Sequence, residues 1–411
     1  MTQPVRLENV IIPPCVRGFA SGDQRFDIDI QNGVIAQLNR SQAAPDFVAA
    51  GTLIPCPVDA HVHIDKTYVV DEVGAADGDL FKAITLMGQH RARWTAADIT
   101  GRMQRAVQDA YQHGTRAMRT HLDWVEPNTP RSLPVFETVR NTWRGRVALQ
   151  CVSLTPLDAF DSSAVGLQIA KELARVNAAC DKAHGEAALM GAFVYRNTDL
   201  HAKLQRVFNL AKAHNLHLDF HVDEGLDIEA GGLRAIAELT VSNSYQGKVT
   251  CGHACSLSVQ PLDEARATLR LCAEAGISLI ALPSTNLYLQ GAWDTTPVER
   301  GITRIKEAAA DGIDVSIATD NVADGFYPHG SYDLLDTYAL GVQAAHLSPA
   351  DAWLSTVTTA PAAAMHLPWD GRIKVGCPAD FVLLAARTAY ELISPAGRQR
   401  RVIRAGQFLT P

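Results

Sequence analysis

The stretch Pro55-Cys56-Pro57-Val58-Asp59-Ala60-His61-Val62-His63-Ile64-Asp65-Lys66 decides the fold, because an apolar run here ends in a polar cluster. In an extended strand, His61 and His63 lie on the same face, since side chains two residues apart share a side. In a helix they would lie on different faces. Two adjacent imidazoles at a strand end can bind one divalent metal ion. The alternative is a pair of ordinary polar side chains at a strand edge, and the rest of the chain decides between the two.

Apolar runs that resemble strands alternate with longer segments of helical periodicity. We identify eight runs: Leu53–Ile64, Thr115–Trp124, Val147–Thr155, Ala188–Tyr195, Leu216–Glu224, Val249–Ser256, Ser278–Ser284 and Val315–Asn321. Helical spacing marks Ala96–Gln112, Ser163–Ala183, Leu200–Ala213, Leu262–Ala275 and Ile302–Ala310. This alternation is typical of parallel strands buried on both faces. It predicts an α/β fold with a (β/α)8 TIM barrel. The alternative is an open doubly wound sheet, but its usual glycine-rich phosphate fingerprint is absent.

Both ends of the chain predict a second, smaller sheet. Asn32-Gly33 separates two alternating segments, Asp27–Ile30 and Val34–Leu38, which is a hairpin signal. Near the other terminus, Phe381–Leu384 and Arg401–Gly406 have the composition of strands. We therefore expect residues 1–54 and 367–411 to form a small domain with an antiparallel sheet, and residues 55–366 to form the barrel.

The bulk composition limits the classes of protein. The 411 residues are 47% hydrophobic and 20% charged, which permits a large core. The net charge of −7 and the lack of a basic block argue against a nucleic-acid partner. No apolar run is long enough to span a membrane, and the N-terminus lacks the layout of a signal peptide. Eight scattered cysteines suit a reducing compartment, so we expect a cytoplasmic protein.

Polar residues gather where the predicted strands end, and a barrel places its chemistry at the C-terminal ends of its strands. Scattered surface histidines would not follow strand ends in this way. The set comprises His61, His63, Arg119, His121, Asp123, Arg196, His221, Glu224, His253, Asp320 and Asn321. We expect many of these side chains to meet in one site.

Four of these residues form a plausible metal site. The imidazoles of His61, His63 and His221 with the carboxylate of Asp320 would hold one Zn²⁺ or Fe²⁺ and leave room for water. A bound metal lowers the pKa of that water to about 7, which makes hydroxide available at neutral pH. A second metal in such barrels commonly needs a lysine on the fourth strand, and Ala187–Tyr195 contains none. We therefore expect one divalent metal ion per subunit.

Other polar residues are candidates for proton transfer. Glu224 could protonate a ring nitrogen and later a leaving amine, or it could be an acid in the first turn of a helix. His253 could orient the hydroxide, or it could be a buried, hydrogen-bonded histidine. Asp320 could also accept the proton of the attacking water. His121 is a candidate support for a ligand, and Lys66, just beyond the ligand strand, is expected to be structural.

At these residues the chain resembles the amidohydrolase superfamily, specifically the bacterial cytosine deaminase group, over nearly its whole length. The resemblance lies in Val58–Lys66, Arg119–Asp123, His221–Glu224, His253, Asn286–Gly291, Arg300–Glu307, Asp320-Asn321 and Tyr327-Pro328. It implies that the small domain is a β-sandwich built from both termini and that the protein is a homo-oligomer. It also implies that His61, His63, His221 and Asp320 bind one Fe²⁺ or Zn²⁺, that Glu224 transfers protons and that His253 assists the hydroxide.

The chain departs from the cytosine-specific pattern of that group. Cytosine deaminases place a glutamine after the third strand to recognise the pyrimidine edge, whereas Pro156 stands here and has no side-chain donor or acceptor. Asp320-Asn321 replaces two aspartates, and Phe326 replaces a tryptophan. The first strand also resembles that of isopropylammelide amidohydrolases, which act on a triazine ring. The residues that we expect to bind the substrate are Asn286, Gln290, Asn321 and Phe326.

These features predict a mononuclear hydrolase of non-peptide C–N bonds that deaminates a small N-heterocyclic substrate, a cytosine-like pyrimidine or a related ring. Two alternatives of the same fold are release of an alkylamine from a triazine ring and hydrolytic opening of a cyclic amide. A third is an inactive barrel used for binding. That alternative is disfavoured because the metal ligands, Glu224 and His253 are all present.

Overall fold

The eight predicted apolar runs each contain one strand of a parallel barrel. The computed structural model describes residues 5–44, 47–125 and 128–410. Neighbours in the eight-stranded sheet follow the order of the chain. The strands are β5 (Val58–Val62), β6 (Ala117–Asp123), β7 (Ala148–Pro156), β8 (Ala187–Val194), β9 (Leu218–Val222), β10 (Val249–His253), β11 (Ser278–Ala281) and β12 (Val315–Ile317). A parallel bridge between Val62 and Asp320 joins the last strand to the first. The predicted barrel is therefore confirmed.

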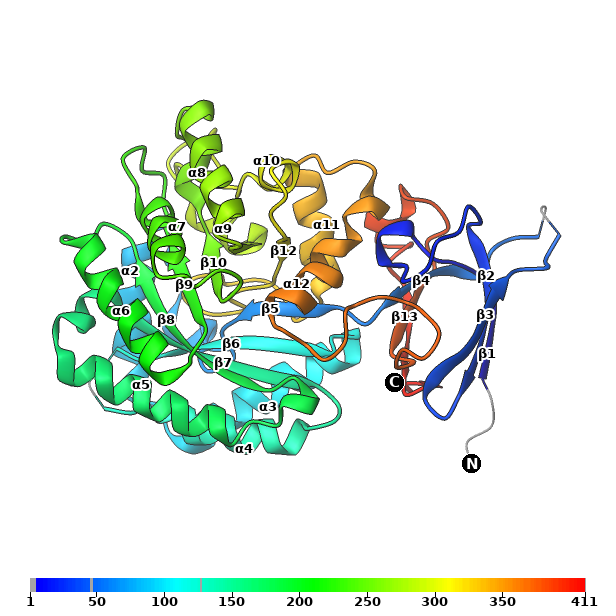
Figure 1. The fold of residues 1–411 in the computed structure, drawn as a ribbon, viewed down its shortest axis with the longest axis horizontal. Coiled ribbons are helices and arrows are strands. Elements are labelled where there is room, and N and C mark those ends of the chain that lie inside the picture. Colours follow the sequence, from blue (N-terminus) through cyan, green and yellow to red (C-terminus); the bar gives the residue numbers. More distant parts are fainter. Residues whose placement is uncertain (1–4, 45–46, 126–127, 411) are drawn as a thin grey trace.

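Helices surround the barrel, as Figure 1 shows. They are α3 (Ala96–His113), α4 (Ser132–Trp143), α5 (Ser163–Ala178), α6 (Leu200–His214), α7 (Gly232–Ser242), α8 (Leu262–Glu274), α10 (Ile305–Ala310), α11 (Leu334–Ala344) and α12 (Thr359–Ala364). All five helices predicted from periodicity are present. The strand-to-helix connections also contain α1 (Val70–Val73), α2 (Leu80–Arg91) and α9 (Pro283–Leu289), which were not predicted. None of the described helices has the length and apolar character needed to cross a membrane.

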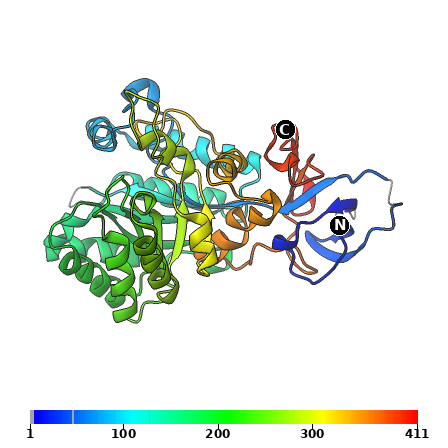
Figure 2. The ribbon, with the colours of Figure 1, turned by 90° about the horizontal axis from the view of Figure 1, so that it is seen from above.

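A seven-stranded sheet from both termini forms the second unit, at one end of the molecule where both chain ends lie (Figure 2). Its strands, in spatial order, are β15 (Gln407–Phe408), β14 (Arg400–Arg404), β13 (Phe381–Leu384), β4 (Gly51–Pro55), β1 (Val5–Ile11), β2 (Arg25–Gln31) and β3 (Val34–Arg40). The pair β1–β4 is parallel, so the sheet is not wholly antiparallel as expected. The domain limits given above, 1–54 with 367–411 and 55–366, stay a prediction.

The first apolar run, expected to be a single strand, is divided between the two sheets. β4 ends at Pro55 and β5 begins at Val58, so Cys56-Pro57 separates them. Pro57 has no N–H for a ladder and restricts the backbone of the residue before it. The N–H of Cys56 instead donates to the carbonyl of Asp380, 3.1 Å away in the small domain. The ligand strand is thus tethered at its start to the second sheet.

Candidate active site

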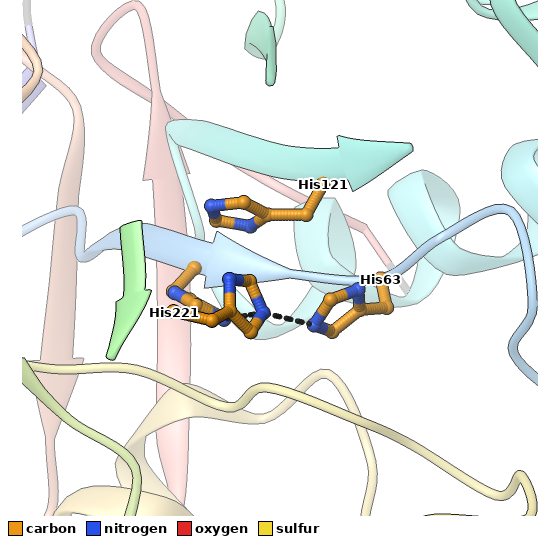
Figure 3. Close-up of side chains that lie close together, drawn as sticks. His63, His121 and His221 are labelled. Carbon is orange, nitrogen blue, oxygen red and sulfur yellow. Dashed lines mark hydrogen bonds between the residues drawn. The ribbon is translucent and has the colours of Figure 1, made fainter. Parts of the chain in front are cut away.

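The four predicted metal ligands converge at the C-terminal end of the barrel. The Nε2 atom of His221 lies 3.1 Å from Nε2 of His61 and 3.2 Å from Nε2 of His63. Asp320, just after β12, places Oδ1 at 3.1 Å from His63 Nε2 and 3.5 Å from His61 Nε2. Figure 3 shows the contact between His63, which directly follows β5, and His221 on β9. Residues 61, 63, 221 and 320 therefore surround one point.

The chemistry of these atoms fits a divalent cation. All four side chains are buried, and burial is the main cause that lowers the pKa of the three histidines well below its usual value. Neutral imidazoles offer lone pairs to a metal ion. Among the described residues, neither carboxylate oxygen of Asp320 has a hydrogen-bond donor. Buried polar atoms normally have partners, so this carboxylate beside the ring nitrogens of His61 and His63, with His221 next to both, is a suitable ligand set for Zn²⁺ or Fe²⁺.

Strained backbone positions Asp320 and His253. Their φ angles are +63° and +69°, in the left-handed region that non-glycine residues rarely adopt. Such strain persists only where the surroundings enforce it. The N–H of Asp320 donates to the carbonyl of His61 at 2.9 Å. The carboxylate of Asp59 accepts from the N–H of Thr319 at 3.1 Å and from its hydroxyl at 2.6 Å. These bonds to β5 hold the segment after β12 in place.

Glu224 lies in the loop after β9, close to the ligand set. Its Oε1 is 3.5 Å from Nδ1 of His253. Burial, and after it the charge of Asp320, raises the pKa of Glu224 well above its usual value, so the carboxyl group can hold a proton. The preceding residue, Asp223, accepts from the N–H groups of the first two residues of α7, at 3.1 and 2.9 Å. Asp223, not Glu224, is therefore the acidic residue that caps the start of α7. The carboxyl group of Glu224 remains available for proton transfer.

His253 is held in one orientation by Asn286. The side-chain amide of Asn286 donates to Nδ1 of His253 at 3.0 Å, so Nε2 carries the ring hydrogen. That Nε2 is buried and has no partner among the residues that the structure describes. Burial lowers the pKa of His253 to about 4, so the ring is neutral. His253 therefore presents one N–H donor at the site.

His121 lies beside the ligands, as its position on β6 suggested. Its ring centroid is 4.0 Å from that of His61, and Figure 3 shows it near His63 and His221. It offers a ring nitrogen within 4.8 Å of the ligand nitrogens of His61, His63 and His221. Its Nε2 donates to Asp219 at 3.2 Å, and Asp219 also accepts from Arg119 at 2.8 Å. This buried network fixes the ring of His121 behind the ligands.

A pocket opens beside this cluster, with about 670 Å³ of empty space that includes open solvent. His63, His221, His253 and Glu224 line one end of it. Its other walls are mostly apolar and comprise Leu80, Ile84, Met87, Val125, Leu154, Pro156, Phe193 and Phe326. The unpredicted helix α2 supplies three of these residues. The pocket therefore offers apolar surfaces for the faces of a flat ring next to the ligand set.

The four predicted substrate-binding residues divide into two pairs. Asn321 and Phe326 line the pocket. Asn286 and Gln290 are buried but are not among its lining residues. Asn286 acts instead on His253, as described above. The set of residues that line the pocket thus gives no support for direct contact between a substrate and Asn286 or Gln290.

A charged trio in the same pocket was not predicted. The ammonium nitrogen of Lys66 lies 2.5 Å from Oδ1 of Asp123, and Nη1 of Arg91 lies 3.0 Å from Oδ2. All three residues line the pocket, and the Lys66 nitrogen is 5.1 Å from the centroid of the Phe326 ring. Lys66 was expected to be structural because nothing near it in sequence identifies its partners. The only signal was its position just beyond the ligand strand.

Comparisons with known sequences agree with this geometry. The protein-family model described as "Amidohydrolase family" matches residues 170–409 of this sequence. A pterin deaminase of Rhizobium rhizogenes is 37% identical over 416 residues, which span 98% of this chain and 93% of that protein. An N-isopropylammelide isopropyl amidohydrolase of a Pseudomonas species is 22% identical, over 94% of each chain.

Solved structures with the same fold include a deaminase and an alkylamine-releasing hydrolase of N-heterocyclic rings. The 5-methylcytosine deaminase of Klebsiella pneumoniae, liganded with 5-fluorocytosine, superposes with a TM-score of 0.83 at 25% identity and covers 99% of this chain and 97% of its own. The N-isopropylammelide isopropylaminohydrolase of Burkholderia multivorans superposes with a TM-score of 0.77 at 23% identity, over 99% of this chain and 98% of that one. The second likeness shows a common fold.

Proposed function

The chain belongs to the amidohydrolase family, which confirms the predicted resemblance, and we propose that it hydrolytically removes the amino group of an N-heterocyclic ring as ammonia. One observation carries this proposal. Three imidazoles and a carboxylate converge beside a pocket that His63 and His221 line, and Glu224, whose pKa burial raises well above its usual value, lines the same pocket. A catalytically inactive barrel would have no need for this combination.

The residues that would hold the metal are His61, His63, His221 and Asp320. The bound ion would supply a water molecule that is activated for attack at neutral pH. Three nitrogen donors and one oxygen donor suit either Zn²⁺ or Fe²⁺, and we propose one such ion per subunit. The absence of a lysine on β8 supports a single ion.

The chain's own groups would move the protons. Asp320 takes a proton from the attacking water, and Glu224 gives its proton to the ring nitrogen next to the amino-bearing carbon. The Nε2–H of His253 donates to the incoming oxygen. Glu224 then takes the proton of the new hydroxyl group and passes it to the amino group, which leaves as ammonia as the C=O bond forms, and the proton held by Asp320 returns to Glu224 for the next turnover. Water and the amino ring are thus converted to ammonia and an oxo ring.

The substrate that we favour is a 2-amino-4-oxopteridine, the pterin class. The 37% identity to a pterin deaminase over nearly the whole chain supports this choice. So does Pro156, which lines the pocket and stands where cytosine deaminases place a glutamine. The apolar walls suit the faces of a flat aromatic ring system.

The test is ammonia release by the metal-loaded enzyme from pterin, cytosine, isocytosine, creatinine and ammelide, with isopropylamine release from N-isopropylammelide as a separate assay. We expect ammonia from pterin and one metal ion per chain by elemental analysis. Isopropylamine release without ammonia from any ring would contradict deamination and favour the alkylamine reaction, which the Pseudomonas relative suggests. Hydrolysis without either amine would favour ring opening.

We also propose a cytoplasmic homo-oligomer without nucleic-acid or membrane partners. The net charge of −7 supports the lack of a nucleic-acid partner. Light scattering of the purified protein tests the oligomer, and a single-chain mass would contradict it.

A further inference from the structure

We propose that the ion pair of Lys66 and Asp123 recognises the lactam edge of the substrate, the adjacent ring N–H and C=O, in place of a side-chain amide. This inference rests on the proposed function and names the ring edge that the site selects. Lys66 would donate to the carbonyl oxygen, and Asp123 would accept from the ring N–H.

Lys66 has unused donors in the pocket. Its side chain is 3% exposed, and its one hydrogen bond among the described residues goes to Asp123. A lysine ammonium carries three hydrogens, so two N–H directions remain for a ligand. Buried ammonium hydrogens are normally used, because a buried charge without partners is costly. A substrate oxygen in the pocket would satisfy this requirement.

Asp123 has unused acceptors in the same place. It is held between two cations, with Lys66 on one oxygen and Arg91 on the other. Both cations lower the pKa of Asp123, against the opposing effect of burial, so it is a carboxylate. An ionised carboxylate has about four lone-pair sites, and the two side chains use two of them. Its backbone N–H also donates to Asp65 at 3.1 Å, which fixes its position.

The pair thus places a donor and an acceptor next to each other on one wall. A glutamine amide offers the same two functions, and a lactam edge needs both. Pro156 lines the same pocket and offers neither. The Phe326 ring, 5.1 Å below the Lys66 nitrogen, provides an apolar surface beside the pair. This wall of the pocket therefore combines a charged donor and acceptor with an apolar surface.

A structural role alone explains the pair poorly. Replacing a buried ion pair with apolar residues is often neutral or stabilising, so stability gives little reason to keep it. Its exposure to a pocket that also contains Glu224 and two ligand histidines places it where a substrate binds. The pair therefore has a function that a purely apolar wall could not provide.

The first test compares two substrates in three variants. Pterin has the lactam edge, and 2,4-diaminopteridine lacks it. We expect Lys66→Met and Asp123→Asn each to lower kcat/KM for pterin by about a hundredfold, mainly through KM, because a hydrogen bond to a charged group is lost. Turnover of the diamino ring should change less than about threefold, so the preference for pterin collapses. Lys82→Met, an exposed lysine on α2 that pairs with Asp77, is the matched control and should keep the preference.

The second test uses the wild-type enzyme and does not depend on variant folding. The 3-methyl and 4-methoxy derivatives of pterin remove the ring N–H, and the second also removes the carbonyl. We expect each to lose about a hundredfold in kcat/KM. Wild-type preference retained in both variants, or undiminished turnover of both derivatives, would overturn the inference and leave deamination intact. No ammonia from any ring with the wild type would overturn the proposed function and the inference together.

Discussion

At the scale of single residues, a change at Glu224 should separate proton transfer from metal binding most clearly. Glu224→Gln keeps the shape of the side chain but cannot transfer a proton. We expect the metal content to stay at the wild-type level and kcat to fall by about 10³, the usual size of a general acid–base contribution. Elemental analysis and an ammonia assay measure the two effects. Turnover near the wild-type rate would contradict the assigned role.

Gly252 on β10 controls the position of a predicted ligand. A Cβ atom there would lie 2.9 Å from Cε1 and 3.0 Å from Nδ1 of His61, closer than packed atoms normally approach. Gly252→Ala should therefore displace His61 and weaken metal binding by about tenfold or more, as the loss of a ligand's support does. Metal affinity measured by chelator competition tests this expectation.

Gly101→Ala is the matched control, because Gly101 lies on α3 with no atom near its added Cβ. This change should leave metal affinity unaltered and stabilise the helix by about 0.5–1 kcal/mol. Equal metal affinity in Gly252→Ala and Gly101→Ala would show that the close approach at His61 is unimportant.

The positions of the candidate ligands could be predicted from sequence, whereas the charged trio could not. His61 and His63 follow a period of two at a strand end, and His221 and Asp320 occupy the equivalent ends of other strands. The environment of Lys66 depends on Asp123, which is 57 residues away, and on Arg91 in a helix that was not predicted. No local pattern in the sequence predicts that these three side chains are in contact. It follows only from the closed barrel.

At the scale of elements, α2 shows why the pocket was harder to predict than the barrel. The barrel strands are buried on both faces and therefore appear as continuous apolar runs. Helix α2 instead covers a pocket, so apolar side chains such as Phe81 and Ile84 stay partly exposed. Its apolar residues do not form the single stripe that identifies a surface helix. The sequence pattern consequently predicted no helix in the segment after β5.

The start of α2 offers a test of its role. The side chain of Asp79 accepts from the N–H of Lys82 at 3.0 Å and caps the helix. Asp79→Ala should destabilise the cap by about 1 kcal/mol and loosen the wall formed by Leu80 and Ile84. We expect KM to rise several-fold while metal content stays constant.

Thr95→Ala is the control for this change, because it removes the cap of α3, which does not line the pocket. Steady-state kinetics of both variants measure KM and show whether α2 contributes to substrate binding. If both raise KM equally, α2 has no special part in substrate binding.

At the scale of the whole molecule, Arg400 joins the small sheet to the barrel. From β14 it contacts both carboxylate oxygens of Asp333, with Nη1 at 2.7 Å from Oδ1. Asp333 in turn caps α11 by accepting from the N–H of Leu335 at 3.1 Å. Arg400→Met would leave a mostly buried carboxylate unpaired and should lower the free energy of unfolding by about 2–4 kcal/mol. Urea denaturation of the metal-loaded protein measures this change.

Arg401→Met is the matched control on the same strand, since Arg401 is exposed and packs over Phe408 in the small sheet. Its effect should stay within about 0.5 kcal/mol. If Arg400→Met is equally mild, the ion pair between the two units contributes little to stability.

Acid sensitivity of the whole molecule should depend in part on the N-terminal end of the barrel. His217, just before β9, packs against His366 with ring centroids 4.7 Å apart. Burial, followed by the effect of His366, lowers the pKa of His217 to about 4. In the unfolded chain a histidine titrates at about 6.5, so below that pH the unfolded state binds more protons than the folded state. Stability contributed by neutral His217 is therefore complete above about pH 7 and decreases as the pH falls toward 4.

Other histidines with a lowered pKa act in the same direction, so the contribution of His217 must be isolated by a difference. His217→Asn removes the titrating ring. We expect the variant to lose less stability than the wild type between pH 7 and pH 5, because one fewer proton is taken up on unfolding. Urea denaturation of both metal-loaded proteins at these two pH values gives the slopes. Equal slopes would show that His217 takes up its proton as readily in the folded protein as in the unfolded chain, which its packing against His366 argues against.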